Sequence, residues 1–396
     1  MCAEYRPISV TPIMSRLLEK VIVKDYIYPA IIHPACTHLF HDQFAFRPTG
    51  STTAALVSLI HKISSLLVEY PYVHVIALDF SKAFDTVRHS TLLAKCADLP
   101  IEDAVYNWLM SFLGNRTHCT KFTGCISCLR RINASIVQGS GIGPVTYVIC
   151  ASDLCPLHKG NSFDKYADDS YLIVPSVNSS TIVEELEHIA KWAHDNNLKL
   201  NRSKTKEIVV HRPRAKNLLF PPAVDGVERL DVINVLGVLV DSTLSFRAQV
   251  DRLVGQSAQT LYALRILKHH GLCGPPLWNV ATATLLSRLL YASPVWWGMV
   301  DAGGRHRLQS VLNKAVKQGF LPKDQASLEL LCDSADMKLF ASILRNPQHV
   351  LHQFLPPVKH TTHNLRSRAH NRVLPNVKDS LFRKTFINRM IFHDCY

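Results

Sequence analysis

Tyr166-Ala167-Asp168-Asp169 brings two adjacent carboxylates to the predicted tip of a strand–turn–strand. The approach, 162–165, is Ser-Phe-Asp-Lys, and the exit, 170–174, is Ser-Tyr-Leu-Ile-Val. Successive side chains of a strand point to opposite faces, so only a tight turn lets both carboxylates converge. Like charges that close raise each other's pKa unless a cation neutralises them, and Mg²⁺ prefers such oxygen ligands. A four-residue motif alone is weak evidence for a metal site, and the residues elsewhere in the sequence must support it.

A third carboxylate lies upstream, at the end of another predicted strand. Residues 72–77 form an apolar, β-branched run typical of a buried strand, and Asp79 follows that run directly. A two-metal phosphoryl-transfer site needs carboxylates from separate elements around ions ~3.5–4 Å apart. One Asp at a strand end and an Asp pair on a hairpin meet that requirement.

The segment Leu78-Asp79-Phe80-Ser81-Lys82-Ala83-Phe84-Asp85 resembles motif A of reverse transcriptases, and the tetrad resembles their motif C. The wording of motif A is similar to that of non-LTR (LINE-type) retrotransposons. Further blocks resemble the same family in the same order: Tyr5-Arg6-Pro7-Ile8-Ser9 with 17–20, Gln43–Pro48 with 50–53, Gln138-Gly139-Ser140 with Gly143-Pro144 (motif B), 198–206 (motif D), Leu236-Gly237-Val238 (the primer-grip motif E), and Leu290-Tyr291-Ala292 with Trp296-Trp297-Gly298. These collinear motifs cover about residues 5–240.

Three departures from the family pattern stand out. Val137 replaces the proline that the family usually has before its motif B glutamine, which removes a local constraint on the backbone. Ala45 stands where the family usually has glycine. The chain starts almost at the first fingers motif, so the endonuclease domain of such elements is expected to be missing.

The resemblance implies a catalytic set. Asp79 and Asp168 would bind two Mg²⁺ ions, with Mn²⁺ as an alternative, and Asp169 would support the metal site. Lys204 would be the general acid for the leaving pyrophosphate, with Lys206 as the other candidate. The ordinary alternatives are turn aspartates and solvated lysines.

The resemblance also implies residues that bind the nucleotide and the template. Phe84 would exclude a 2′-hydroxyl as a steric gate, and Arg47 would hold the triphosphate. Gln138 would hydrogen-bond the nucleotide or template base, and Gly139 would permit close backbone approach. The alternatives are a core phenylalanine, a solvated arginine and a surface glutamine.

Composition agrees with a nucleic-acid enzyme. The 396 residues carry 44 Lys+Arg against 31 Asp+Glu, a net charge of +13 that attracts phosphate. Residues 301–396 alone have 15 Lys+Arg and 7 Asp+Glu, or 15 − 7 = +8. Eleven cysteines include the pair Cys125 and Cys128, but zinc would need a second matching pair, so free thiols are expected. We expect no membrane span, because no long apolar run is free of charge.

The fold expected is α+β: a right-hand polymerase with fingers, palm and thumb, its antiparallel palm sheet packed by helices on one side. Helices are predicted at 52–69, in two pieces of 90–113 separated at Pro100, and at 181–196, 246–270 and 275–291; strands at 121–137, 206–211 and 232–240. Residues 1–240 would form fingers and palm (fingers mainly 1–71 and 116–137), 241–300 a helical thumb, and 301–396 a basic, helical C-terminal extension of uncertain order.

The expected function is RNA-directed DNA polymerase of a non-LTR retrotransposon. Its partners would be an RNA template, a DNA primer or target DNA, and dNTPs, in a nuclear or cytoplasmic ribonucleoprotein with the element RNA. Two alternatives stay open. One is a truncated, inactive or domesticated fragment that only binds RNA. The other is an RNA-dependent RNA polymerase, which the aromatic Phe84 disfavours because such an enzyme must admit the 2′-hydroxyl.

Overall fold

A five-stranded sheet forms the centre of the molecule. The computed structural model describes residues 9–213, 219–359 and 370–393. The strand order is β6 (Ser162–Tyr166), β7 (Asp169–Pro175), β1 (Tyr72–Leu78), β8 (Lys206–His211) and β9 (Glu228–Arg229). Neighbouring strands are antiparallel except β8 and β9. Apolar side chains of both faces are buried, so the sheet needs cover on each side.

Helices cover both faces of this sheet. On one face, α4 (Thr52–Glu69) packs on Val73, Val75 and Ile173; on the other, α8 (Gly143–Cys150) and α9 (Ile182–Asp195) pack with Ile76 and Leu172. Alternate residues of one strand therefore enter two different cores. The expectation of helices on one side was wrong, because the strands are apolar on both faces.

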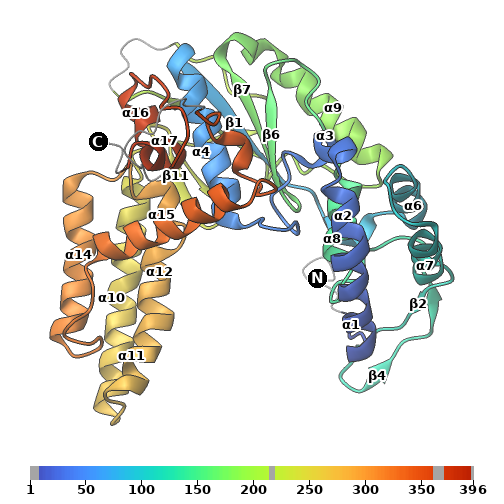
Figure 1. Ribbon diagram of the computed structural model, residues 1–396. Coiled ribbons are helices and arrows are strands. Elements are labelled where there is room, and N and C mark those ends of the chain that lie inside the picture. The colour runs from blue at the N-terminus through green and yellow to red at the C-terminus, as the bar shows by residue number, and fades with distance from the viewer. Residues whose placement is uncertain (1–8, 214–218, 360–369, 394–396) are drawn as a thin grey trace.

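The fingers and the thumb extend from the same side of the sheet as two arms (Figure 1). The fingers comprise α1 (Ile13–Ile22), the π turn η2 (Val23–Ile27), α2 (Tyr28–Ile31), η3 (Pro34–Cys36), α3 (Thr37–Phe40), α6 (His89–Ala97), α7 (Asp103–Leu113) and the short strands β2 (Thr117–His118), β3 (Lys121–Phe122), β4 (Cys125–Ile126) and β5 (Arg130–Arg131). Two short elements, α5 (Ala83–Thr86) and η4 (Ser176–Thr181), follow β1 and β7.

The thumb begins with a small hairpin and continues as helices. Its elements are β10 (Val232–Val235), β11 (Val238–Asp241), α10 (Arg247–His269), α11 (Pro275–Ala281), the π turn η5 (Thr282–Leu286), α12 (Ser287–Leu290), α13 (Ser293–Trp296) and α14 (Ala302–Lys317). The hairpin corrects the single strand predicted for 232–240: a turn at Leu236 and Gly237 divides it. The helices at 52–69, 246–270 and 275–291 were predicted within a few residues.

The C-terminal region belongs to the same core as the palm. It contains α15 (Leu328–Arg345), η6 (His352–Phe354), α16 (Ser380–Arg383) and α17 (Phe386–Ile391). Phe386, Ile387 and Met390 are buried in the cluster that also holds α4. The expectation of uncertain order was wrong for 370–393, because these apolar residues pack on the back of α4 (Figure 1). Most of the basic run 359–372 and the motif at 5–8 lie outside the described residues.

Among the described residues, only α4 is long and apolar enough to cross a membrane by composition, and 56% of its length is buried. Its buried side chains contact the sheet, as in the core helix of a folded domain.

Candidate active site

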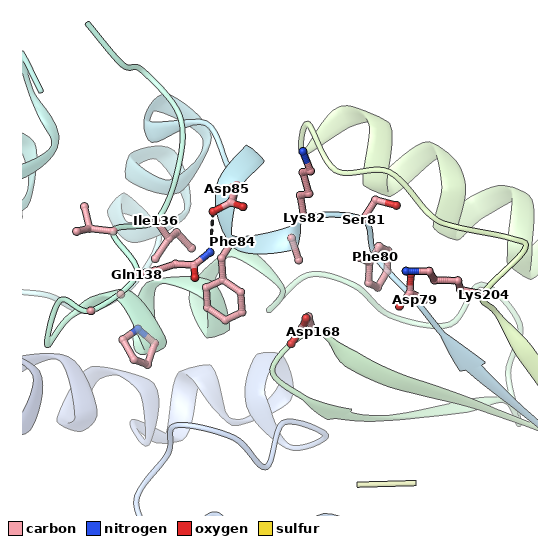
Figure 2. A pocket seen from close by; sticks show the side chains of 15 residues that line it. Asp79, Phe80, Ser81, Lys82, Phe84, Asp85, Ile136, Gln138, Asp168 and Lys204 are labelled. Carbon is pink, nitrogen blue, oxygen red and sulfur yellow. Dashed lines mark hydrogen bonds between the residues drawn. The ribbon is translucent and has the colours of Figure 1, made fainter. Parts of the chain in front are cut away.

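A cavity of ≈ 760 Å³ opens at the end of β1, between the palm and the fingers. Its lining brings together six of the residues that the sequence singled out: Asp79, Phe84, Gln138, Gly139, Asp168 and Lys204. Figure 2 shows Asp168 at the tip of the β6–β7 turn, facing the segment from Asp79 to Phe84. Residues from four separate stretches of the chain therefore meet at one place.

Strand register places the three carboxylates. The last pair between β1 and β7 is Leu78 with Ser170, so one further step sets Asp79 opposite Asp169. Tyr166 pairs with Asp169 in β6–β7, which leaves Ala167 and Asp168 as the turn. Ala167 has φ +57°, the left-handed conformation that a two-residue turn needs. The turn thus sets Asp168 beside Asp79 and Asp169 at one sheet edge.

Gln43 holds this turn from the fingers. Its side-chain oxygen accepts the N–H of Ala167 at 3.1 Å and the N–H of Ala45 at 3.0 Å, and the residue is 2% exposed. The preceding backbone runs beside β6, where Lys165 N–H donates to the Asp42 carbonyl and Phe44 N–H donates to the Lys165 carbonyl. The motif around Gln43 was noticed in the sequence, but its structural role was missed because the contact spans 124 residues.

A buried ion pair strengthens the same junction. Lys165 is 1% exposed, and its ammonium lies 3.1 Å from Asp42 and donates to the carbonyls of Ala151 and Leu154 at 3.1 and 2.8 Å. Removing two charges from water is costly unless they are paired and hydrogen-bonded, as these are. Strand β6, which leads to the Asp168 turn, is therefore held through Lys165 by three oxygen partners. No local sequence pattern predicted this role.

The carboxylates repel one another. Partial burial raises the pKa of Asp169 to about 6, and the charges of Asp168 and Asp79 add to the rise. Burial also raises the pKa of the Tyr147 hydroxyl, which lies near Asp168. Carboxylates that raise one another's pKa in this way provide the electrostatic condition that favours a bound cation.

The donor set fits Mg²⁺, which takes oxygen ligands and is usually held by one or two carboxylates, waters and substrate phosphates. Within residues 9–213, 219–359 and 370–393, no three His, Cys, Asp or Glu side chains are gathered closely enough to enclose a metal. The carboxylates of Asp79 and Asp168 therefore offer part of a coordination shell, and phosphate and water oxygens would supply the rest. Cys125 and Cys128 are exposed and form no disulfide within the described residues.

Phe84 forms one wall of the cavity. Its ring stacks on that of Tyr147 from α8, with centroids 4.5 Å apart and planes at 24°. Tyr147 is 1% exposed, so the stack holds the Phe84 ring rigidly at the surface of the cavity. Figure 2 shows that the ring points towards Asp168. A rigid ring at this place restricts the volume beside the carboxylates.

Gln138 is oriented by Asp85. Its side-chain N–H₂ donates to an Asp85 carboxylate oxygen at 2.7 Å (Figure 2), which leaves its carbonyl oxygen as the free acceptor. Gly139 has φ +106°, and a Cβ there would lie 2.6 Å from the Ser9 carbonyl oxygen, so no other residue fits. Glu19, buried in α1, accepts the N–H groups of Gly141 and Ile142 before α8. Glu19 belongs to the sequence motif at 17–20, which gave no indication of these hydrogen bonds.

Lys204 lies on a loop that is tied to Asp79. The N–H of Asn201 donates to the Asp79 carbonyl at 2.8 Å, and the N–H of Lys204 donates to the Asn201 carbonyl at 3.1 Å. In Figure 2 the Lys204 side chain extends towards Asp79. Lys206 instead pairs with Glu228 outside the cavity. Of the two lysines proposed from the sequence, Lys204 is the one at the site.

Arg47 does not line this cavity. Its guanidinium donates to the carbonyls of Phe40 and Gln43, the latter at 3.1 Å. Burial lowers its pKa to about 10, and Asp42 opposes that change. In this conformation the side chain bonds the fingers backbone, and the triphosphate contact expected for it stays a prediction.

Residues 2–240 match the family model described as "Reverse transcriptase (RNA-dependent DNA polymerase)". The chain belongs to the reverse transcriptase family. The matched region contains every residue of the cavity. The carboxylates, the aromatic wall and the oriented glutamine are thus parts of a polymerase palm and fingers.

Two of the curated relatives come from transposons of Drosophila melanogaster. Over 339 residues the chain is 27% identical to a "Probable RNA-directed DNA polymerase from transposon BS", covering 79% of this chain and 36% of the relative. It is 26% identical over 264 residues to the "RNA-directed DNA polymerase from mobile element jockey", covering 63% of this chain and 28% of the relative. The chain thus spans about a third of the length of the curated relatives that it matches.

A solved structure of Candida tropicalis telomerase with a fragment of telomeric RNA is also similar, at 13% identity and a TM-score of 0.42 over 86% of this chain and 56% of that one.

Proposed function

We propose that this chain is an RNA-directed DNA polymerase that adds dNTPs to a primer 3′-hydroxyl on an RNA template. The observation that carries the proposal is the meeting of Asp79 and Asp168 in one cavity with an aromatic wall and a tethered lysine. The primer oxygen would attack the α-phosphorus, forming a P–O bond and breaking the α–β phosphoanhydride, and pyrophosphate would leave. Relatives named as transposon polymerases support this reaction class.

Each residue of the site has a part in this reaction. Asp79 and Asp168 would hold two Mg²⁺ ions with Asp169 beside them, and the bound ions would lower the pKa of the 3′-hydroxyl and offset phosphate charge. Lys204 would give its proton to the leaving pyrophosphate. The Phe84 ring, fixed on Tyr147, would collide with a 2′-hydroxyl and so select dNTP.

Gln138 and Gly139 would contact the nucleotide and the template strand. Because Asp85 accepts one N–H of the Gln138 amide and so fixes its orientation, the carbonyl oxygen of Gln138 would meet the nucleotide or template base as an acceptor. The net charge of +13 would supply phosphate attraction for the hybrid duplex and for a ribonucleoprotein with the element RNA in the nucleus or cytoplasm.

Primer extension tests the proposal. The parent chain receives an RNA template, a DNA primer, Mg²⁺ and labelled dNTPs, beside Asp168→Asn and the control Asp225→Asn. Asp225 is exposed and does not line the cavity, so its substitution should leave extension intact. Extension by the parent and the control but not by Asp168→Asn is the expected result.

Two outcomes would favour the alternatives. A parent that binds the hybrid but never extends it would indicate a fragment that only binds RNA. A parent that extends with rNTPs as well as with dNTPs would remove the steric role of Phe84 and favour an RNA-synthesising enzyme.

A further inference from the structure

The turn of the β10–β11 hairpin is unusually well fixed for a two-residue turn. Leu236 and Gly237 both have positive φ, +45° and +84°, the pattern typical of tight hairpins. A Cβ on Gly237 would lie 3.3 Å from the Tyr291 ring, so the glycine lets that ring pack directly on the backbone. Contacts from three other elements meet at this turn.

Tyr291 holds the turn from the thumb. Its hydroxyl donates to the Leu236 carbonyl at 2.7 Å, across 55 residues of chain. From α10, Arg252 donates to the Gly237 carbonyl and, at 2.6 Å, to the side-chain oxygen of Gln249. That oxygen also accepts the N–H of Leu239 at 3.0 Å. The backbone of the turn therefore receives two side chains, from Tyr291 and Arg252, and Gln249 holds the strand that follows it.

Tyr291 is itself held in place by the residues that follow it. It ends α12, and Ala292 has φ +49°, a conformation that a non-glycine residue adopts only under tertiary constraint. The indole N–H of Trp296 donates to the Tyr291 carbonyl at 3.0 Å, and Trp296 is 0% exposed. The sequence block 290–298, which had no role assigned, thus directs the Tyr291 ring towards the hairpin.

The turn lies beside the catalytic carboxylates. The backbone of Leu236 hydrogen-bonds Tyr171, which lies two residues after Asp169 in β7 and so points to the same face. Leu236 is therefore joined to the palm by Tyr171 and to the thumb by Tyr291.

We infer that Tyr291 is a positioning residue: through the Leu236–Gly237 turn it fixes where the primer terminus lies relative to Asp79 and Asp168. The inference rests on the proposed polymerase function, because a primer end that reaches those carboxylates must pass the turn beside them. Because Tyr291 acts through its hydrogen bond to the turn, its effect is on primer placement and not on dNTP binding or chemistry as such.

The test compares Tyr291→Phe, which keeps the ring and removes the hydroxyl, with Tyr26→Phe as a matched control. Tyr26 lies in the fingers at 40% exposure against 38% for Tyr291, and no hydrogen bond of its hydroxyl is found among the described residues. Three quantities are measured: hybrid binding by fluorescence anisotropy, amide hydrogen exchange over 232–241, and the separate KM values for hybrid and dNTP.

Loss of one hydrogen bond should weaken hybrid binding and raise its KM about two- to ten-fold. The amides of Leu236 and Leu239 should exchange faster in Tyr291→Phe, while the KM for dNTP and the Tm stay at parent values. Equal effects of Tyr26→Phe, an equal rise in the dNTP KM, or parent-like binding and exchange would each overturn the inference.

The two proposals fail in different ways. A parent chain that binds the hybrid but does not extend it refutes the polymerase function, while binding and exchange still decide the role of Tyr291. A parent that binds no hybrid overturns both.

Discussion

Replacing Gln43 by methionine should loosen the catalytic turn. The substitution keeps the volume and removes the acceptor shared by the N–H groups of Ala45 and Ala167. Leaving a buried donor unpaired costs about 1–3 kcal/mol, so two would cost about 2–6 kcal/mol. The Gln43 amide group has no partner within the described residues, and its removal offsets part of that cost. We therefore expect a loss of about 2–4 kcal/mol in the free energy of unfolding.

Urea unfolding and hydrogen exchange measure this effect. In Gln43→Met the Ala167 amide should exchange much faster, and primer extension should slow because Asp168 follows that amide directly. Gln309→Met is the control: its side-chain oxygen accepts the Leu328 N–H at 2.8 Å and its amide donates to Asn313 at 2.7 Å, so the substitution should cost about 1–3 kcal/mol and leave Ala167 protected. An unfolding free energy within about 0.5 kcal/mol of the parent, with Ala167 still protected in Gln43→Met, would refute the reasoning.

Three further predictions concern selectivity, pH and the C-terminal core. Phe84→Val should raise rNTP incorporation relative to dNTP about 10–200-fold in competitive extension, since the ring is the obstacle; an unchanged ratio would place the gate elsewhere. In the folded chain the pKa of Asp169 is raised from 3.8 to about 6. As pH rises between these values, Asp169 loses its proton in the unfolded chain first, so the free energy of unfolding falls. Asp169→Asn should flatten that fall in urea titrations, and Mg²⁺ should reduce it in the parent; no difference between the two proteins would exclude this charge repulsion. Arg389→Met should cost about 3–5 kcal/mol in urea, because it strands buried Asp336, 2.8 Å from the guanidinium, and adding Asp336→Asn should recover part of the loss.

Local patterns in the sequence predicted local structure well. The helix 52–69 and the strand 206–211 have the predicted bounds, because apolar spacing and the flanking polar residues specify them without help from distant parts. The division of 232–240 at Leu236 was missed because the run is apolar throughout and only Gly237 marks a turn. Its conformation depends on Tyr291, which is remote in sequence.

The carboxylates could be placed from motifs, whereas their supports could not. Asp79 follows a continuous apolar run and Asp168 lies in the turn between two strands, so local patterns locate both. Gln43, Glu19 and Lys165 act through hydrogen bonds to backbone groups far along the chain. Hydrophobic periodicity along the chain does not predict such distant backbone partners. The only local indication is a polar residue inside a sequence motif. For Arg47 the residue type predicted a phosphate contact, but in the structure its guanidinium donates to the backbone carbonyls of Phe40 and Gln43.

The C-terminal region completes the palm rather than extending it. Helix α4 is apolar around much of its circumference, and the sheet covers only one side of it. The remaining side is covered by α13, α16 and α17, and the His61 ring lies 5.1 and 5.2 Å from the rings of Phe354 and Phe382. The Val350 N–H also donates to Thr49 in the fingers motif, and Gln353 donates to the His41 carbonyl. The same fingers segment supplies Gln43, which bonds the turn that carries Asp168. Contacts from Val350 and Gln353 therefore help to hold that turn through the fingers.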